Sequence, residues 1–227
     1  MPIYQLSDDD IRFPDAIESE PDGLLAIGGT LSPERLVNAY ASGIFPWYDR
    51  KPILWWSPNP RTILIPQDYK ISKSLKRTIK SGKYEVRLDS AFSRVIDTCA
   101  RISRSGETGT WITTEMKIAY KKLFVIGIAH SVETFHNNHL VGGLYGVSIG
   151  KAFFGESMFH TETDASKVAF AYLSSWLTAR NFLFVDCQMH TDHLQSLGAI
   201  DIPKMDYLDL LAKAIKFPTL KGKWSGL

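Results

Sequence analysis

The sequence has few of the features that mark secreted, membrane-spanning or strongly charged proteins. Its two cysteines, Cys99 and Cys187, are too few for a disulfide scaffold and suit a reducing compartment. The first residues, MPIYQLSDDD, lack the basic and apolar regions of a signal peptide. No window approaches the roughly 18 apolar residues of a membrane-spanning helix. We therefore expect a cytoplasmic protein, and the net charge of +2 means that any basic surface must come from local clustering.

The fingerprints of nucleotide cofactors and of metal sites are also missing. Neither a P-loop nor a G-x-G-x-x-G pattern occurs. Cys187, His190 and His193 have the spacing of half a zinc site, but no second cluster of cysteine and histidine supplies the other half. We expect neither a cofactor nor a metal.

Proline is unevenly distributed along the 227 residues. Nine of the eleven prolines lie at or before Pro66, and residues 67–202 contain none. This change in composition predicts a small loop-rich N-terminal domain, residues 1–62, followed by a more regular domain, residues 63–227. The apolar content of 44% is enough for one large core or two modest ones.

Hydrophobic periodicity predicts a mixed α+β fold. Helices are expected at 32–43, with Ser32 as the N-cap and Pro33 in the first turn, and at 71–82, 90–100, 114–127, 163–180 and from 191. Strands are expected at 84–88, 131–135, 140–149, 152–159 and 181–188, with the tetrad HNNH as a hairpin turn. This order favours a mainly antiparallel mixed sheet flanked by helices.

Residues 43–61, GIFPWYDRKPILWWSPNPR, combine five aromatic residues with four prolines. Because each proline removes a backbone donor and restricts φ, this segment should form neither an ordinary helix nor a central strand. It is either a rigid wall on which a nucleobase stacks or a well-packed loop.

The helix expected at 71–82 carries a stripe of positive charge. Lys73, Lys76, Arg77 and Lys80 lie on one face, and no acidic residue occurs between residues 70 and 83. Such a stripe can follow a phosphate backbone, and the alternative is an ordinary solvated surface.

Three polar residues lie among apolar neighbours at or near the expected ends of strands: Glu156, Asp186 and Gln188. Buried carboxylates are costly unless they are paired or functional. Asp186 and Gln188 are two residues apart, so on a regular strand they share a face. They could hold an incoming amine, or they could simply form structural hydrogen bonds.

A set of motifs, in order from about residue 3 to residue 210, resembles the bacterial leucyl/phenylalanyl-tRNA–protein transferases. These motifs are FPDAIESEPDGLLAIGGTLSPERLVNAYASGIFPWY, WWSPNPR, TWIT, AHSVE, LVGGLYGVSIGKAFFGESMF, ASK, VDCQ and HLQSLGA. The resemblance implies a small N-terminal domain followed by a domain similar to the acetyltransferase (GNAT) fold. It also implies transfer of leucine or phenylalanine, and less readily methionine, from aminoacyl-tRNA to proteins that begin with arginine or lysine. Such a product is marked for degradation.

The resemblance also suggests roles for individual residues. Trp47, Trp111 and Tyr120 match positions near the terminal adenosine of the tRNA, and the basic helix matches the region that meets the acceptor stem. An apolar aminoacyl pocket would be lined by Leu144, Phe153, Met158, Phe170, Leu173, Leu177 and Val185. Asn181 stands where glycine is frequent in the family.

The reaction implied by this resemblance is aminolysis of an ester. It needs two positioned substrates, a neutral amine and a stabilised oxyanion. We expect Asp186 and Gln188 to hold and help deprotonate the amine while Glu156 orients the substrates. Two rivals are a tRNA-binding module without catalysis and a CoA-dependent N-acyltransferase. The segment SMFHTETDASK contains no glycine-rich loop that would cradle the pyrophosphate of CoA, and this weighs against a CoA-dependent acyltransferase.

Overall fold

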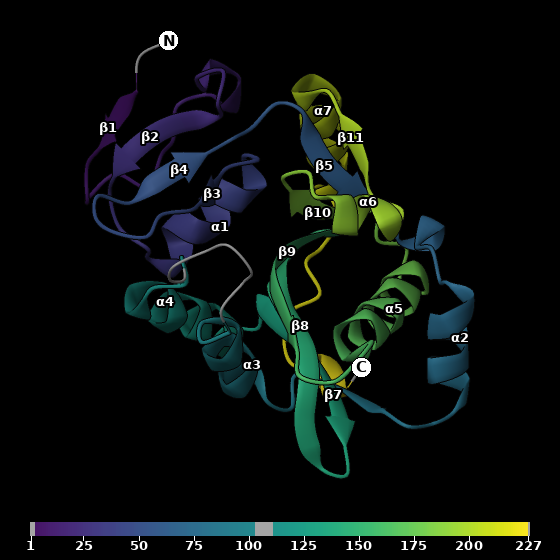
Figure 1. The fold of residues 1–227 in the computed structure, drawn as a ribbon. Helices are drawn as coiled ribbons and strands as arrows, with labels where there is room; N and C mark the ends of the chain where they lie inside the picture. Colours follow the sequence, from purple (N-terminus) through teal and green to yellow (C-terminus); the bar gives the residue numbers. More distant parts are fainter. Residues whose placement is uncertain (1–2, 103–110, 227) are drawn as a thin grey trace.

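The computed structural model describes residues 3–102 and 111–226, which form two sheets surrounded by helices (Figure 1). The smaller sheet has the strand order β1-β2-β4-β3, with β1 at Tyr4–Leu6, β2 at Leu24–Gly28, β3 at Phe45–Pro46 and β4 at Leu54–Trp56. The short helices η1 (Ala16–Glu18) and α1 (Pro33–Ala41) complete this N-terminal unit.

The larger sheet has seven strands in the order β11-β5-β10-β9-β8-β7-β6. Among the described residues, each neighbouring pair in it is antiparallel except β10 and β9, which run parallel. The strands are β5 (Arg61–Leu64), β6 (Glu85–Leu88), β7 (Ala129–His136), β8 (His139–Ile149), β9 (Ala152–His160), β10 (Phe184–Gln188) and β11 (Ile200–Ile202).

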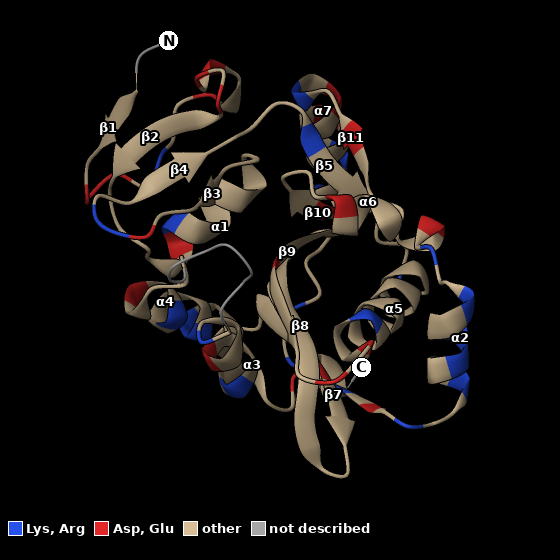
Figure 2. Ribbon diagram, in the orientation of Figure 1, with Lys and Arg blue, Asp and Glu red and all other residues tan. Residues whose placement is uncertain are grey.

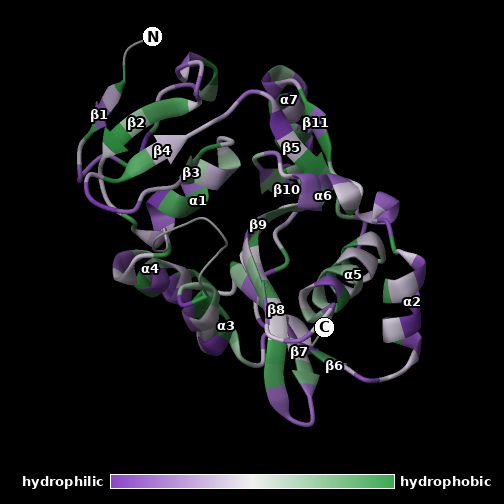
Figure 3. Ribbon diagram, viewed as in Figure 1, coloured by the Kyte–Doolittle hydropathy of each residue, from purple (hydrophilic) through white to green (hydrophobic). Residues whose placement is uncertain are grey.

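Helices cover both faces of the larger sheet (Figure 1). One face packs against α5 (Ala165–Thr178), and the other against α3 (Phe92–Cys99) and α4 (Thr114–Val125). The hydrophobic core accordingly has two clusters. Figure 3 shows hydrophobic residues along much of the central strands. The remaining helices are η2 (Pro66–Asp68), α2 (Lys73–Lys80), α6 (Asp192–Ser196), α7 (Lys204–Ala214) and η3 (Trp224–Gly226).

The predicted fold class is confirmed, and so are several local details. The Ser32 side chain caps α1 by accepting from the Arg35 N–H, and Pro33 occupies the first turn. The tetrad HNNH forms a hairpin turn in which Asn137 and Asn138 both have positive φ, +49° and +62°. Asn181 also has a positive φ, +57°, which explains why this position suits glycine or asparagine.

The expectation for the proline-rich segment 43–61 is wrong in one respect. Strand β4 lies inside the smaller sheet, between β2 and β3. This is possible because β4 itself contains no proline, whereas Pro46 occurs on the edge strand β3, where a missing donor costs little. The domain boundary expected after residue 62 falls within β5, and the division into 1–62 and 63–227 stays a prediction.

A buried lysine, Lys204, joins two segments of the chain that are far apart in sequence. Lys204, at the start of α7, donates from Nζ to the Ser19 hydroxyl and to the Ala16 carbonyl oxygen, 3.3 Å away. Its own N–H donates to the Asn59 side chain at 3.0 Å. The last long helix thereby holds the first 3-10 helix in place.

Candidate active site

The carboxyl group of Glu156 lies where strand β9 is irregular. Its neighbours in sequence pair with β8 in shifted register, Gly155 with Gly146 and Ser157 with Tyr145, so Glu156 itself has no partner there. A bulge of this kind redirects a side chain. It points the Glu156 carboxyl into the core, where the residue is 8% exposed. Glu156 is thus in mid-strand and not near a strand end as expected.

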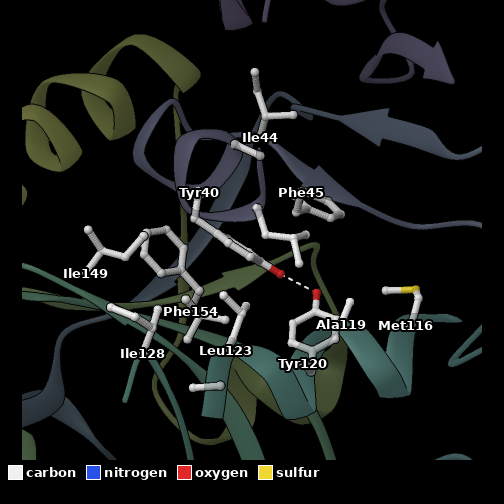
Figure 4. Packing of buried hydrophobic residues seen from close by; sticks show 14 of the residues in the cluster. Tyr40, Ile44, Phe45, Met116, Ala119, Tyr120, Leu123, Ile128, Ile149 and Phe154 are labelled. Carbon is white, nitrogen blue, oxygen red and sulfur yellow. Dashed lines mark hydrogen bonds between the residues drawn. The ribbon is translucent and has the colours of Figure 1, made fainter. Parts of the chain in front are cut away.

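Three side chains from three different elements converge on this carboxyl. Tyr40 of α1 donates to Oε1 at 2.6 Å, Tyr120 of α4 donates to Oε2 at 2.8 Å, and Gln188 Nε2 of β10 donates to Oε1 at 3.2 Å. The two phenol oxygens also contact one another (Figure 4). The cluster therefore joins the N-terminal unit to the large sheet.

The surroundings of Glu156 disfavour its charged form. Burial raises the pKa of Glu156 from its ordinary value of 4.5 to about 7, although the hydrogen bonds from both tyrosines oppose the rise, and the negative charge of Asp186 adds to it. Such a group can give or take a proton at neutral pH.

Asp186 forms a separate buried ion pair next to this cluster. Its carboxylate accepts from Arg61 Nε at 2.9 Å, from Arg61 Nη2 at 2.7 Å and from the Tyr207 hydroxyl at 2.8 Å. Burial disfavours the charge on Arg61, but the Asp186 carboxylate outweighs burial and raises the pKa of the guanidinium. Asp186 and Arg61 are at most 1% exposed. The structure thus places Asp186 away from solvent, with its oxygens engaged inside the protein.

Strand β10 is also irregular, which corrects the expectation that Asp186 and Gln188 simply share a face. The pairing of β10 with β5 shifts between these residues, and Gln188 has a positive φ of +66°. Asp186 Oδ1 accepts the Gln188 N–H at 2.8 Å and so stabilises the bend. The bend directs the Gln188 amide to Glu156. Asp186 acts on the site through Gln188.

The two tryptophans expected at the tRNA terminus come from neighbouring segments. Trp47 is 37% exposed and lies edge-on to Trp56 with 5.7 Å between ring centroids. Trp111 is half-buried, and its segment is tied to that of Trp47 by an ion pair of 3.0 Å between Lys51 and Glu115. Tyr120, in contrast, is fully buried and serves Glu156. The nucleoside roles stay predictions.

The seven residues expected to line an aminoacyl pocket belong to one hydrophobic cluster. Met158 is half-buried and packs against the other six. These six are at most 4% exposed: Leu144, Phe153, Phe170, Leu173, Leu177 and Val185. They come from β8, β9, α5 and β10. Met158 alone of the seven also lines a groove of about 620 Å³, with residues 160–164, Ser166, Lys167 and His193. Whether an aminoacyl group enters this cluster stays a prediction.

The basic stripe predicted for the second helix is on the surface. Lys73, Lys76, Arg77 and Lys80 of α2 are all exposed, and Figure 2 shows the blue stripe along this helix. The apolar side of the helix differs from the expectation: only Leu75 is buried, because α2 begins at Lys73 and leaves Ile71 outside it, while Ile79 is 41% exposed.

Sequence reasoning missed Tyr40, Arg61 and Tyr207. Arg61 ends the motif WWSPNPR and Tyr40 lies in the amphipathic helix SPERLVNAYASG, so both were available as polar residues in long motifs. Among the described residues no group of three or more histidine, cysteine or acidic side chains comes together as a metal site. Nor does any described helix have the length and apolar character needed to cross a membrane.

Comparison with known proteins gives a consistent result. Residues 63–212 match the family described as leucyl/phenylalanyl-tRNA protein transferase, and residues 29–59 match the N-terminal domain of that family. Leucyl/phenylalanyl-tRNA–protein transferases of Desulfatibacillum aliphaticivorans and Maridesulfovibrio salexigens are 54% and 55% identical to the chain over 99% of its length. The chain in turn covers 97% and 94% of theirs.

Solved structures resemble the chain only remotely. The structure of L-PGS from Bacillus licheniformis has a TM-score of 0.40 at 10% identity and covers 75% of this chain, which spans 57% of that one. A GCN5-related N-acetyltransferase-like protein from Streptococcus suis has a TM-score of 0.35 at 13% identity, with coverages of 70% and 59%. The sequence relatives, near 50% identity over almost the whole length, decide the matter: this chain belongs to the leucyl/phenylalanyl-tRNA protein transferase family.

Proposed function

We propose that this aminoacyltransferase moves leucine or phenylalanine, and less readily methionine, from aminoacyl-tRNA to the α-amino group of proteins that begin with arginine or lysine. The reaction takes place in the cytoplasm and marks the acceptor for degradation. Family membership supports the reaction class. The observation that carries the chemistry is Glu156, a buried carboxyl with a pKa of about 7 that accepts from Tyr40, Tyr120 and Gln188.

Glu156 supplies the proton acceptor that the reaction needs. The α-amine attacks the ester carbonyl, the C–O bond to the tRNA breaks, and the 3′-oxygen leaves as a hydroxyl that takes up the proton lost by the attacking nitrogen. An amide replaces an ester, which is energetically downhill. The amine must be neutral when it attacks, and a free α-amino group titrates at about 7.7–8.0. An ionised Glu156 accepts the proton of that amine, and its negative charge favours acceptors with a basic first residue. Gln188 orients the Glu156 carboxyl.

Asp186 has a positioning role in this scheme. Its carboxylate is bound by Arg61, by Tyr207 and by the Gln188 N–H, and the residue is fully buried. We therefore expect Asp186→Asn to keep a pH-dependent rise in rate but to move it to lower pH, because the Asp186 charge raises the pKa of Glu156. A general base would lose that rise together with its carboxylate. Transfer rates measured from pH 6 to pH 9 distinguish the two roles.

The tRNA donor is held at three places in the proposed function. Exposed Trp47 and half-buried Trp111 provide aromatic surface for the terminal adenosine, since stacking contributes roughly 1–3 kcal/mol per base. The apolar cluster around Phe153 receives the amino-acid side chain, where desolvation rejects polar residues and shape rejects β-branched ones. The exposed stripe of α2 meets the acceptor stem.

The test is transfer of labelled leucine and phenylalanine from charged tRNA to short peptides beginning with Arg, Lys, Asp or Ala. Label on the Arg and Lys peptides alone, without ATP or CoA, is the expected result. A tRNA-binding module would give no transfer and would bind charged and uncharged tRNA equally. A CoA-dependent acyltransferase would require CoA, for which SMFHTETDASK offers no glycine-rich cradle.

A further inference from the structure

The C-terminal tail, residues 215–226, is anchored to the loop before β7 and to the turn between β8 and β9, although it lies beyond the matched family region, which ends at residue 212. The Gly222 N–H donates to the Gly127 carbonyl oxygen at 3.2 Å, and the Thr219 hydroxyl accepts from the Gly150 N–H at 3.0 Å. Gly127 has a φ of +71°, and a Cβ there would lie 2.2 Å from Gly222 N. The tail therefore has a defined path.

Trp224 is the buried end of this tail. Its indole is 1% exposed and lies between two flat partners: the His130 ring, 3.8 Å away at 10°, and the Trp176 ring, 4.0 Å away at 23°. The Trp224 N–H donates to Asp89 Oδ2 at 2.7 Å, and the same oxygen is 2.9 Å from His130 Nδ1. Both the backbone and the ring of Trp224 are thus fixed.

The same indole borders the proposed aminoacyl pocket. Trp224 belongs to the hydrophobic cluster that contains Leu144, Phe170, Leu173, Leu177 and Val185. Its ring lies against the ring of the pocket residue Phe153, with 5.8 Å between ring centroids and 43° between planes. Phe153 consequently has the Trp224 indole as backing, and the position of the Phe153 ring depends on the volume of that indole.

We propose that Trp224 is a specificity-determining residue that sets the depth of the aminoacyl pocket by supporting Phe153. This inference rests on the proposed function. A smaller side chain at position 224 leaves space into which Phe153 can relax, because close-packed interiors respond to lost volume by partial collapse. The pocket then becomes deeper and accepts donors larger than phenylalanine.

The experiment compares three donors on one tRNA, charged with leucine, phenylalanine or tryptophan, with an Arg-initiated peptide as acceptor. For Trp224→Leu the ratio of tryptophan to phenylalanine transfer should rise about tenfold, within the range that small volume changes in an apolar pocket produce. Trp224→Phe, a milder change, should raise it less. Lys223→Ala alters an exposed neighbour in the same tail and should leave the ratio unchanged.

A purely structural role for Trp224 predicts a different result. Leu211→Ala serves as the comparison, since Leu211 is buried in the other cluster and its loss destabilises the fold away from the pocket. If Trp224→Leu and Trp224→Phe lower thermal stability as Leu211→Ala does and leave the donor ratio at its wild-type value, the inference is overturned. Absence of transfer by the wild-type protein would instead refute the proposed function. Because the ratio is measured within each variant, a smaller folded fraction does not affect it.

Discussion

At the scale of single residues, Glu156 gives the proposed reaction a defined pH dependence. Because the pKa of Glu156 is raised to about 7 and the ionised form accepts the proton, kcat/KM should increase as pH rises through 7. Glu156→Gln should remove the part of this increase that is centred near pH 7, leave the rise caused by the acceptor amine at about 7.7–8.0, and lower the rate about 100-fold, the lower end of what general acid–base catalysis contributes. Transfer rates between pH 5.5 and 8.5 check the prediction. Glu34→Gln, at an exposed carboxyl on α1, is the control and should behave as wild type.

Tyr40 adjusts the pKa of the Glu156 carboxyl through a hydrogen bond. Its hydroxyl donates to Glu156 Oε1, which stabilises the ionised form and lowers the pKa of the carboxyl. Tyr40→Phe should therefore move the rise in activity to higher pH. At pH values above the rise, the rate of the variant should differ less from that of wild type than at pH values within it. The pH profile is the measurement. An unchanged midpoint with a uniformly lower rate would mean that Tyr40 serves packing alone.

The sequence named Glu156 and Gln188 but did not reveal how they meet. A strand pattern assumes strict alternation, and both residues lie at irregular points of their strands. The donors to Glu156 are also distant in the chain: Tyr40 is 116 residues away and Tyr120 is 36. Only tertiary packing brings them together. The buried pair of Asp186 with Arg61 was hidden for the same reason, at a separation of 125 residues.

At the scale of elements, α2 should contribute to tRNA affinity through charge alone. Its four basic residues are exposed, so in the proposed complex each would neutralise phosphate without a fixed partner geometry. Lys76→Ala should raise the KM for charged tRNA, leave kcat unchanged and reduce the salt dependence of binding by about one counterion. Titrations at several salt concentrations test this. Lys213→Ala, an exposed lysine on α7, is the matched control and should have no effect.

Most helices were predicted because their signals are local, but α7 was not predicted, and neither were strands β5 and β11 of the larger sheet. Ser32, Ser72 and Thr191 each cap the helix that follows, as their hydroxyls accept from an N–H three residues on. The short strands of the N-terminal unit were missed. Strands of two to five residues, separated by glycine and proline, are too short to display a period of two.

At the scale of the whole molecule, buried carboxyls should make the fold less stable as pH rises. Burial raises the pKa of Glu156 to about 7 and also raises that of Glu133. Below pH 4.5 these groups are protonated in both the folded and unfolded states; above it the unfolded chain ionises first, so the free energy of unfolding falls until the folded pKa is passed. At about 1.4 kcal/mol per pKa unit, Glu156 alone accounts for roughly 3 kcal/mol.

Urea denaturation at pH 5 and pH 8 measures this loss of stability. Glu156→Gln removes the titrating group and should lose less stability over that range than wild type, by roughly 3 kcal/mol. Glu34→Gln, whose carboxyl is exposed, should follow the wild-type curve. Equal losses in Glu156→Gln and wild type would show that Glu156 is ionised in the folded protein at both pH values.

The lysine that joins α7 to the first 3-10 helix has a consequence for synthesis on the ribosome. Ser19 leaves the ribosome 185 residues before its partner Lys204 is made. At translation rates of about 5–20 residues per second, roughly 10–40 s pass before the contact between Ser19 and Lys204 can form. Glu156 likewise emerges long after Tyr40. A nascent chain therefore lacks the complete cluster of Tyr40, Tyr120, Glu156 and Gln188 until most of the chain has been made.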